Sequence, residues 1–133
     1  MDRMIFVNLP VGDLARARTF YTGLGLTVNE MFSDERVVCV VVSDTICVML
    51  LDHSRFADFT PLPIADARTT TQVLLCLTAA DRAEVDALAS AALAHGGREL
   101  RPVQDEGPMY ARTVTDPDGH VWELLHMDLA ASA

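Results

Sequence analysis

The sequence predicts an α+β fold in which one βαβββ unit occurs twice along a single domain of residues 1–133. Strand-like and helix-like segments follow one another in the same order in each half of the chain. A stretch of low periodicity, rich in proline and aspartate, separates the halves. The strand–turn–strand segment 40–48 has a counterpart in 113–122. We therefore expect an internal duplication of residues 1–56 and 70–128.

In the first half, the pattern of apolar residues predicts one strand, one helix and three further strands. Asp13 stands where a helix N-cap is expected, and Gly25 follows the apolar stripe of that helix as an end signal. Segment 52–71 contains Pro61 and Pro63 and has little periodicity, which predicts a connector. The expected strands are 4–9, 26–32, 37–42 and 45–51.

The second half repeats this order. Asp81 is a candidate N-cap, and Glu84 follows it with the spacing of a capping box. Segment 116–119, Asp-Pro-Asp-Gly, favours a tight hairpin turn. The acidic segment 104–108 is a simple connection or, as an alternative, a lid. The expected strands are 72–77, 99–103, 110–115 and 120–127.

Composition excludes several classes of function. Half of the residues are hydrophobic and 22% are charged, which predicts a packed domain that neither spans a membrane nor remains disordered. The formal net charge of -9 disfavours binding to nucleic acid. No lysine occurs, so a lysine Schiff base and a P-loop are excluded. Three cysteines at no metal-like spacing, without a targeting segment, predict reduced thiols and a cytoplasmic protein.

Two motifs, each in the expected half and at the expected element boundary, resemble the glyoxalase/bleomycin-resistance/extradiol-dioxygenase superfamily, also called vicinal oxygen chelate proteins. The motifs are Val11-Gly12-Asp13-Leu14 with Phe20-Tyr21 and Leu24-Gly25, and Asp116-Pro117-Asp118-Gly119-His120-Val121-Trp122-Glu123-Leu124. The resemblance implies paired βαβββ modules that form an open barrel, a cavity lined by them, and usually a homodimer. It does not imply one reaction, since the superfamily contains isomerases, dioxygenases, epimerases, thiol transferases and drug-binding proteins.

The resemblance also implies where a metal would be held. Metal-dependent members place a His or carboxamide in the first strand of each module and a carboxylate or His in the last. Glu123 is the expected carboxylate, but its duplicated position is Met49, or Val48 in the neighbouring register. Phe6 is the first-strand position, with Gln72 or Leu74 as its counterpart. Neither register supplies a histidine, so we expect no complete metal site and no cofactor.

The histidines do not replace these ligands. His120 and His126 are each three residues from Glu123, and an odd separation in a strand directs side chains to opposite faces. His95 ends a helix, where a cation suits the helix dipole, and His53 falls in the connector. We interpret all four as structural or surface residues.

Glu123 is the candidate catalytic residue, as a general base or as an anchor for a cationic or hydroxylated ligand. The alternative is a carboxylate that faces solvent on an exposed edge. Tyr110 and Arg112 share a strand face and offer a phenol and a guanidinium group, although Arg112 pairing with Asp105 or Glu106 is an equal alternative. The candidate ligand-binding residues are Phe6, Asn8, Met49, Gln72, Tyr110 and Arg112. For the apolar ones, a plain core role is the alternative. We interpret Cys39, Cys47 and Cys76 as small hydrophobic residues of the core.

The sequence thus predicts a glyoxalase-like protein that binds a small organic molecule without a complete metal site, in the cytoplasm and as a homodimer. The alternative is a metal-dependent lyase, isomerase or dioxygenase-type enzyme of the same superfamily, similar to lactoylglutathione lyase, or one that uses Glu123 as its base.

Overall fold

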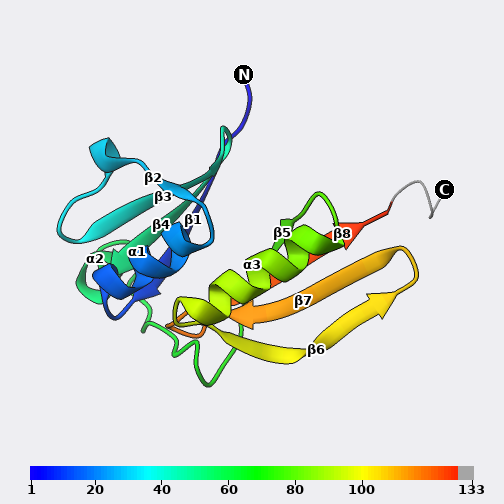
Figure 1. Cartoon of the computed structure of the whole chain (residues 1–133). Coiled ribbons are helices and arrows are strands. Elements are labelled where there is room, and N and C mark those ends of the chain that lie inside the picture. The colour runs from blue at the N-terminus through cyan, green and yellow to red at the C-terminus, as the bar shows by residue number, and fades with distance from the viewer. Residues whose placement is uncertain (129–133) are drawn as a thin grey trace. The chain divides into compact units, whose positions relative to one another are not determined.

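The computed structural model describes residues 1–128, and the chain divides into two compact units, the first ending at Asp66 and the second beginning at Ala67. Each unit contains a four-stranded mixed sheet and a helix that follows the first strand (Figure 1). This confirms the predicted α+β class and the two βαβββ modules, and the boundary falls inside the predicted connector.

The first unit has the sheet order β1-β4-β3-β2. Strand β1 pairs in parallel with β4, whereas β3 pairs antiparallel with both β4 and β2. The elements are β1 (Ile5–Val11), α1 (Leu14–Gly23), β2 (Thr27–Val28), the 3-10 helix η1 (Glu30–Phe32), β3 (Val37–Ser43), β4 (Ile46–Asp52) and α2 (His53–Ala57).

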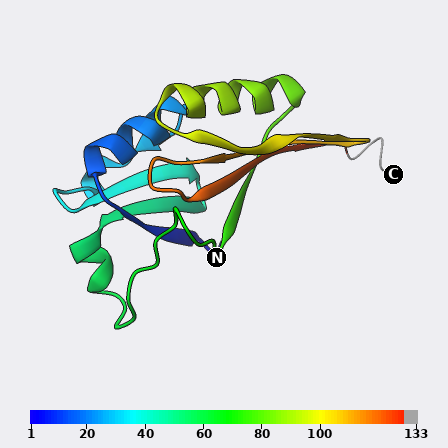
Figure 2. The same ribbon diagram turned by 90° about the horizontal axis from the view of Figure 1, so that it is seen from below.

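The second unit has the equivalent order β5-β8-β7-β6, with β5 parallel to β8 and the other pairs antiparallel. Its elements are β5 (Leu74–Thr78), α3 (Arg82–Ala94), β6 (Arg98–Glu106), β7 (Met109–Thr115) and β8 (Val121–Met127). In both units the long helix lies over one face of its own sheet (Figure 2). We refer to the opposite face of each sheet as its helix-free face.

Side chains that cap local backbone groups set the helix starts, as predicted. Asp13 accepts a hydrogen bond from the backbone N–H of Arg16 at 3.0 Å. Asp81 accepts one from the N–H of Glu84 at 2.8 Å, and the Glu84 carboxylate reaches back to the N–H of Ala80 at 3.1 Å. Each pair satisfies donors that a helix N-terminus leaves open.

The turn at 116–119 is also confirmed. One oxygen of the Asp116 carboxylate accepts hydrogen bonds from the N–H groups of Asp118 and His120, each at 2.9 Å. Gly119 has a φ of +98°, and a Cβ at this position would come within 2.8 Å of the Ala67 backbone. This turn therefore requires glycine both for its backbone conformation and for space.

The predicted strand 26–32 is wrong beyond its first residues. Only Thr27–Val28 pairs as a strand, and Glu30–Phe32 forms η1. The Asn29 side chain accepts from the N–H of Met31 at 3.1 Å, and Ser33 Oγ accepts from the N–H of Cys39 at 3.0 Å. These side chains compete with the ladder for backbone groups and end the strand.

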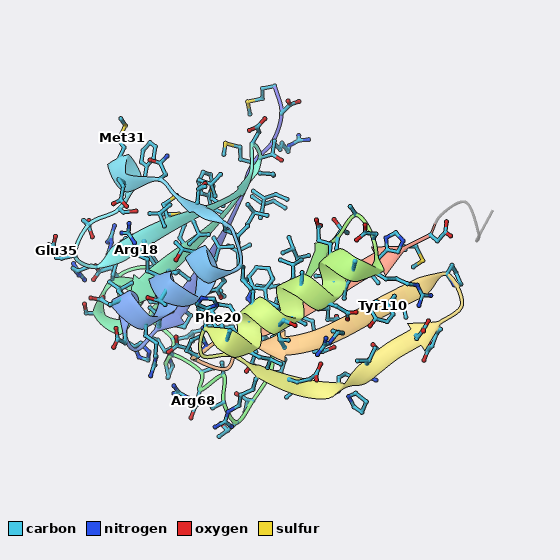
Figure 3. All side chains as sticks on the ribbon, viewed as in Figure 1. Arg18, Phe20, Met31, Glu35, Arg68 and Tyr110 are labelled. Carbon is cyan, nitrogen blue, oxygen red and sulfur yellow. The ribbon has the colours of Figure 1, made fainter. Side chains whose placement is uncertain are left out.

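Arg18 of α1 forms an ion pair with Glu30 of η1. Met31 is 86% exposed and points outward from the tip of η1 in Figure 3. The contact between η1 and α1 is therefore the ion pair of Arg18 with Glu30, and η1 buries none of its own apolar side chains.

Three other boundaries differ from the prediction. The connector contains α2, because Asp52 caps it by accepting from the N–H of Arg55 at 2.7 Å. Strand β5 begins at Leu74, so Gln72 precedes it. Residues 104–106 continue β6 into a tight hairpin turn at Gly107, whose φ is +64°. A lid at 104–108 is therefore wrong, since three of its five residues are paired strand.

The core of each unit lies between the long helix and its sheet. In the second unit, the apolar stripe of α3 packs on Val114 and Leu124, which are 0% and 1% exposed. The buried helix residues are Ala17, Phe20 and Tyr21 in α1 and Val85, Ala89 and Ala92 in α3. Burial of Phe20, Tyr21 and Val85 contributes about 1.5–3 kcal/mol each, and burial of the three alanines contributes less.

Candidate functional site

Strands β4 and β8 have the same burial pattern at equivalent positions of their sheets. Cys47, Val48, Met49 and Leu50 of β4 are buried, buried, half-buried and buried, and residues 121–124 of β8 repeat this pattern. Met49 is therefore the counterpart of Glu123, as predicted, and the alternative position Val48 is excluded.

The helix caps determine which residue of the second unit is equivalent to Phe6. Asp13 and Asp81 cap equivalent helices, so counting back from each matches Phe6 with Leu74. Gln72 is exposed and stands before the strand. Of the two alternatives for the counterpart of Phe6, the structure selects Leu74.

Three predicted ligand-binding residues come together in the first unit. Asn8 pairs across strands with Met49, which in turn pairs with Cys39. Phe6 is two residues before Asn8 on the same strand, and hence on the same face. Phe6 is 53% exposed. This face is apolar, with one carboxamide.

In the second unit the equivalent row is Cys76, Glu123 and Thr113 on β5, β8 and β7. Glu123 is half-buried and Cys76 is exposed, which corrects the core role predicted for that cysteine, whereas Cys39 and Cys47 are buried as predicted. Burial first, and the nearby Glu123 carboxylate second, raise the pKa of the Cys76 thiol. The thiol therefore remains protonated beside the carboxylate at neutral pH.

The Glu123 row contains polar groups without partners. Thr113 is 4% exposed, and its Oγ1 is buried with no hydrogen bond to residues 1–128. Within the same range, no hydrogen bond or ion pair reaches the Glu123 carboxylate. A buried hydroxyl without a partner costs free energy, so its presence beside an unpaired carboxylate marks this row as a place for an added polar group.

Tyr110 and Arg112 lie on the other face of this sheet, which corrects the prediction that they line a trough with Glu123. Tyr110 donates a hydrogen bond to Asp86 of α3 at 2.7 Å, and Arg112 pairs with Asp86 at 3.3 Å and Glu99 at 2.8 Å. Figure 3 labels Tyr110 beside α3. The hydrogen bond to Asp86, followed by burial, raises the pKa of the Tyr110 phenol.

These contacts give Tyr110 and Arg112 a structural role, because they fasten α3 to β7. The predicted pairing of Arg112 with Asp105 or Glu106 is also wrong, since Asp105 instead pairs with Arg82 at 2.9 Å.

His126 lies on the face opposite to Glu123, as predicted. His126 pairs in register with Tyr110, and its Nδ1 lies 3.3 Å from the Ala79 carbonyl oxygen, on the helix-covered side. His95 ends α3, with its Nδ1 2.7 Å from the Ala91 carbonyl oxygen. These contacts are structural.

The donor set does not fit a bound transition metal. The two rows offer a thioether, a carboxamide, thiols, one hydroxyl and one carboxylate, and histidine is missing from both. Among residues 1–128 no group of three or more His, Cys, Asp or Glu side chains is arranged to hold a metal ion. Three or four such ligands are usual for a tight site.

Comparison with known proteins agrees with the fold. Residues 3–43 match the family model described as bleomycin resistance protein-like N-terminal. No match was found among curated proteins. None of the helices within residues 1–128 has the length and apolarity that crossing a membrane requires.

Three solved structures illustrate the likeness. A glyoxalase/bleomycin resistance protein/dioxygenase family enzyme from Burkholderia phytofirmans is 17% identical with a TM-score of 0.78, covering 95% of this chain and 99% of its own. The fosfomycin resistance protein FosX from Mesorhizobium loti is 17% identical with a TM-score of 0.70, covering 98% and 96%. The bleomycin resistance determinant encoded on transposon Tn5 is 19% identical with a TM-score of 0.63, covering 96% and 99%.

At these identities the solved structures establish a shared fold, and the match over residues 3–43 adds the family signal in the sequence. Together with the two motifs, they show that this chain has the fold of the glyoxalase/bleomycin-resistance/dioxygenase superfamily, the vicinal oxygen chelate proteins.

Proposed function

We propose that this protein binds a small organic molecule on the helix-free face of the second sheet, with Glu123 as its polar anchor and without a metal ion. The observation that carries the proposal is the unpaired Glu123 carboxylate next to the buried, unpartnered hydroxyl of Thr113. A carboxylate in such surroundings favours a ligand that brings an ammonium or hydroxyl donor. In the first unit taken by itself, Phe6, Asn8 and Met49 are proposed as a separate apolar surface for a ligand.

Two further points of the proposal rest on other grounds. A homodimer is implied by the superfamily. A cytoplasmic location is inferred from the three free thiols of the chain. Sedimentation velocity at micromolar concentration tests the first, and localisation of the tagged protein in cells tests the second.

A thermal-shift screen of small amines and phenols, with bleomycin and fosfomycin included because similar folds are named for them, tests the binding function. We expect compounds that raise the melting temperature of the wild type and have no effect on Glu123→Gln. Glu106→Gln is the matched control, since Glu106 is an exposed carboxylate at the end of β6. Tyr110→Phe should also keep binding, because its hydroxyl contacts α3.

Retention of the full ligand shift by Glu123→Gln would overturn the proposal. The absence of a metal is tested separately by elemental analysis of the purified protein. We expect far less than one equivalent of Zn, Ni, Mn or Fe per chain, and a stoichiometric ion in the wild type that is lost in Glu123→Gln would contradict this expectation.

The same unpaired carboxylate favours one alternative, a lyase or isomerase in which Glu123 is a general base. Turnover of the adduct of methylglyoxal and glutathione, abolished in Glu123→Gln and kept in Glu106→Gln, would support that activity over simple binding.

A further inference from the structure

The Glu123 row continues across the whole sheet and ends in an unpaired cation. In the pairing of β6 with β7, Arg101 is the register partner of Thr113, just as Thr113 is the partner of Glu123. Directly opposed residues of antiparallel strands share a face of the sheet. The four strands thus bring a thiol, a carboxylate, a hydroxyl and a guanidinium group into one row: Cys76, Glu123, Thr113 and Arg101.

Arg101 is exceptional among the arginines of this acidic chain. The chain has ten Lys plus Arg, all arginine, against nineteen Asp plus Glu, so acidic partners are abundant. Yet within residues 1–128, the Arg101 side chain makes no hydrogen bond or ion pair, and the same holds only for the side chains of Arg3 and Arg98. Of these three, Arg101 alone is paired in register with the buried, unpartnered hydroxyl.

The irregular pairing of β6 brings Arg101 to this position. The register shifts on both sides of Arg101, between Glu99 and Arg101 and again between Arg101 and Gln104. Bulges of this kind redirect a side chain relative to the regular alternation of the strand. Here Glu99 contacts Arg112 on the helix-covered face, whereas Arg101 is matched to Thr113 on the opposite face.

Glu123 and Arg101 carry opposite charges but form no ion pair, because the β7 strand separates them. Two strand spacings place their Cα atoms roughly 10 Å apart. Thr113 stands between Glu123 and Arg101 on the central strand, and its hydroxyl has both a donor and acceptor positions free. A molecule with a positive end and a negative end would satisfy all three groups at once.

We infer that the ligand of this face is a small organic zwitterion, whose ammonium group pairs with Glu123, whose carboxylate pairs with Arg101, and whose body crosses Thr113. This inference rests on the proposed binding function and names its ligand class. Arg101 is then the residue that determines specificity for an acidic group. Charge-assisted hydrogen bonds at both ends favour the zwitterion over either singly charged half.

Three matched probes test this inference on the full-length protein: para-aminomethylbenzoate, which is a zwitterion, and its two halves, benzylamine and benzoate. Dissociation constants are measured by NMR titration of the wild type. We expect the zwitterion to bind at least about tenfold more tightly than each half. Arg101→Gln should reduce its affinity to that of benzylamine, and Glu123→Gln should reduce its affinity to that of benzoate.

Arg98→Gln is the charge-matched control on the same strand, and it should leave the preference for the zwitterion unchanged. Both Arg98 and Arg101 are exposed on an edge strand, so the fold of these variants is expected to persist, and the dispersion of their NMR spectra checks this. Equal binding of the three probes, or a preference that survives Arg101→Gln, overturns the inference.

The probes also separate this inference from the proposed function. If benzylamine binds the wild type and not Glu123→Gln, while the zwitterion gains nothing over benzylamine, the proposed function stands and the zwitterion inference falls. If none of the probes binds, and no compound of the thermal-shift screen depends on Glu123, both fall.

Discussion

Replacement of Thr113 by valine should make the ligand-free protein more stable. The hydroxyl is buried without a hydrogen-bond partner, and the residue is 4% exposed. Valine has nearly the same shape, keeps the β-branched side chain that strands favour, and removes the polar group. A buried hydroxyl without a partner costs about 1–3 kcal/mol, so the free energy of unfolding should rise by about 1–2 kcal/mol.

For a chain of this length, that gain corresponds to a rise in melting temperature of roughly 3–7 °C. Urea unfolding followed by circular dichroism gives the free energy, and calorimetry gives the temperature. Thr115→Val is the matched control. Thr115 is on the same strand and face and is 9% exposed, but its hydroxyl is not left buried without a partner. Its replacement should change the free energy of unfolding by less than about 0.5 kcal/mol.

The same Thr113→Val variant should bind any ligand of the Glu123 row more weakly, because the hydroxyl that a ligand would satisfy is gone. Stability and binding are thus expected to move in opposite directions. A variant that loses 1 kcal/mol or more of stability would refute the reasoning, since it would mean that the hydroxyl already has a partner in the free protein.

Three other perturbations follow from the structure. Leu124→Ala removes a side chain that is 1% exposed beneath α3 and should lower the free energy of unfolding by about 2–5 kcal/mol in urea titrations; a loss below 1 kcal/mol would contradict the packing. Gly119→Ala should lower the melting temperature, since its φ is +98° and its Cβ would meet the Ala67 backbone at 2.8 Å; an unchanged melting temperature would contradict the turn. Iodoacetamide should alkylate Cys76 slowly at pH 8, because burial and then the Glu123 carboxylate raise the pKa of the thiol. Alkylation should be faster in Glu123→Gln, and equal rates in the two proteins would contradict an interaction between Glu123 and Cys76.

The local elements of this fold were predictable because their causes are local. Asp13 and Asp81 cap helices through backbone groups three residues away, and Asp116 closes its turn through Asp118 and His120. These interactions depend on spacing within a few residues, which the sequence displays directly. The strand predicted at 26–32 failed for the same kind of reason, since the capping ability of Asn29 outweighed an apolar run.

The face occupied by Tyr110 and Arg112 was not predictable from their spacing. Alternation establishes that the two residues share a face, but it does not establish which face the helix covers. The contacts of Asp86 in α3 with both side chains show that they lie on the helix-covered face. An acidic residue in the middle of a helix that packs on a sheet is a signal that a basic or phenolic partner belongs on the covered face.

Thr113, Cys76 and Arg101 were missed as partners of Glu123 for a different reason. Their association depends on strand pairing between segments far apart in the sequence. The register shifts that match Arg101 to Thr113 leave no trace in the apolar pattern of 98–106, which is exposed at eight of its nine positions. The only signal in the sequence was the internal duplication, which made Met49 the position equivalent to Glu123.

The parallel pairing of β1 with β4, and of β5 with β8, has a kinetic consequence. In each unit the first strand to be synthesised is bound in the sheet by the last one, whereas β3 and β4, or β7 and β8, meet through short turns. The two hairpins can form early, but β1 and β5 can join their sheets only after β4 and β8, respectively, have been synthesised. Closure of the long loop between those strands sets the entropic barrier, so the leading strand is the slowest part of each unit to assemble.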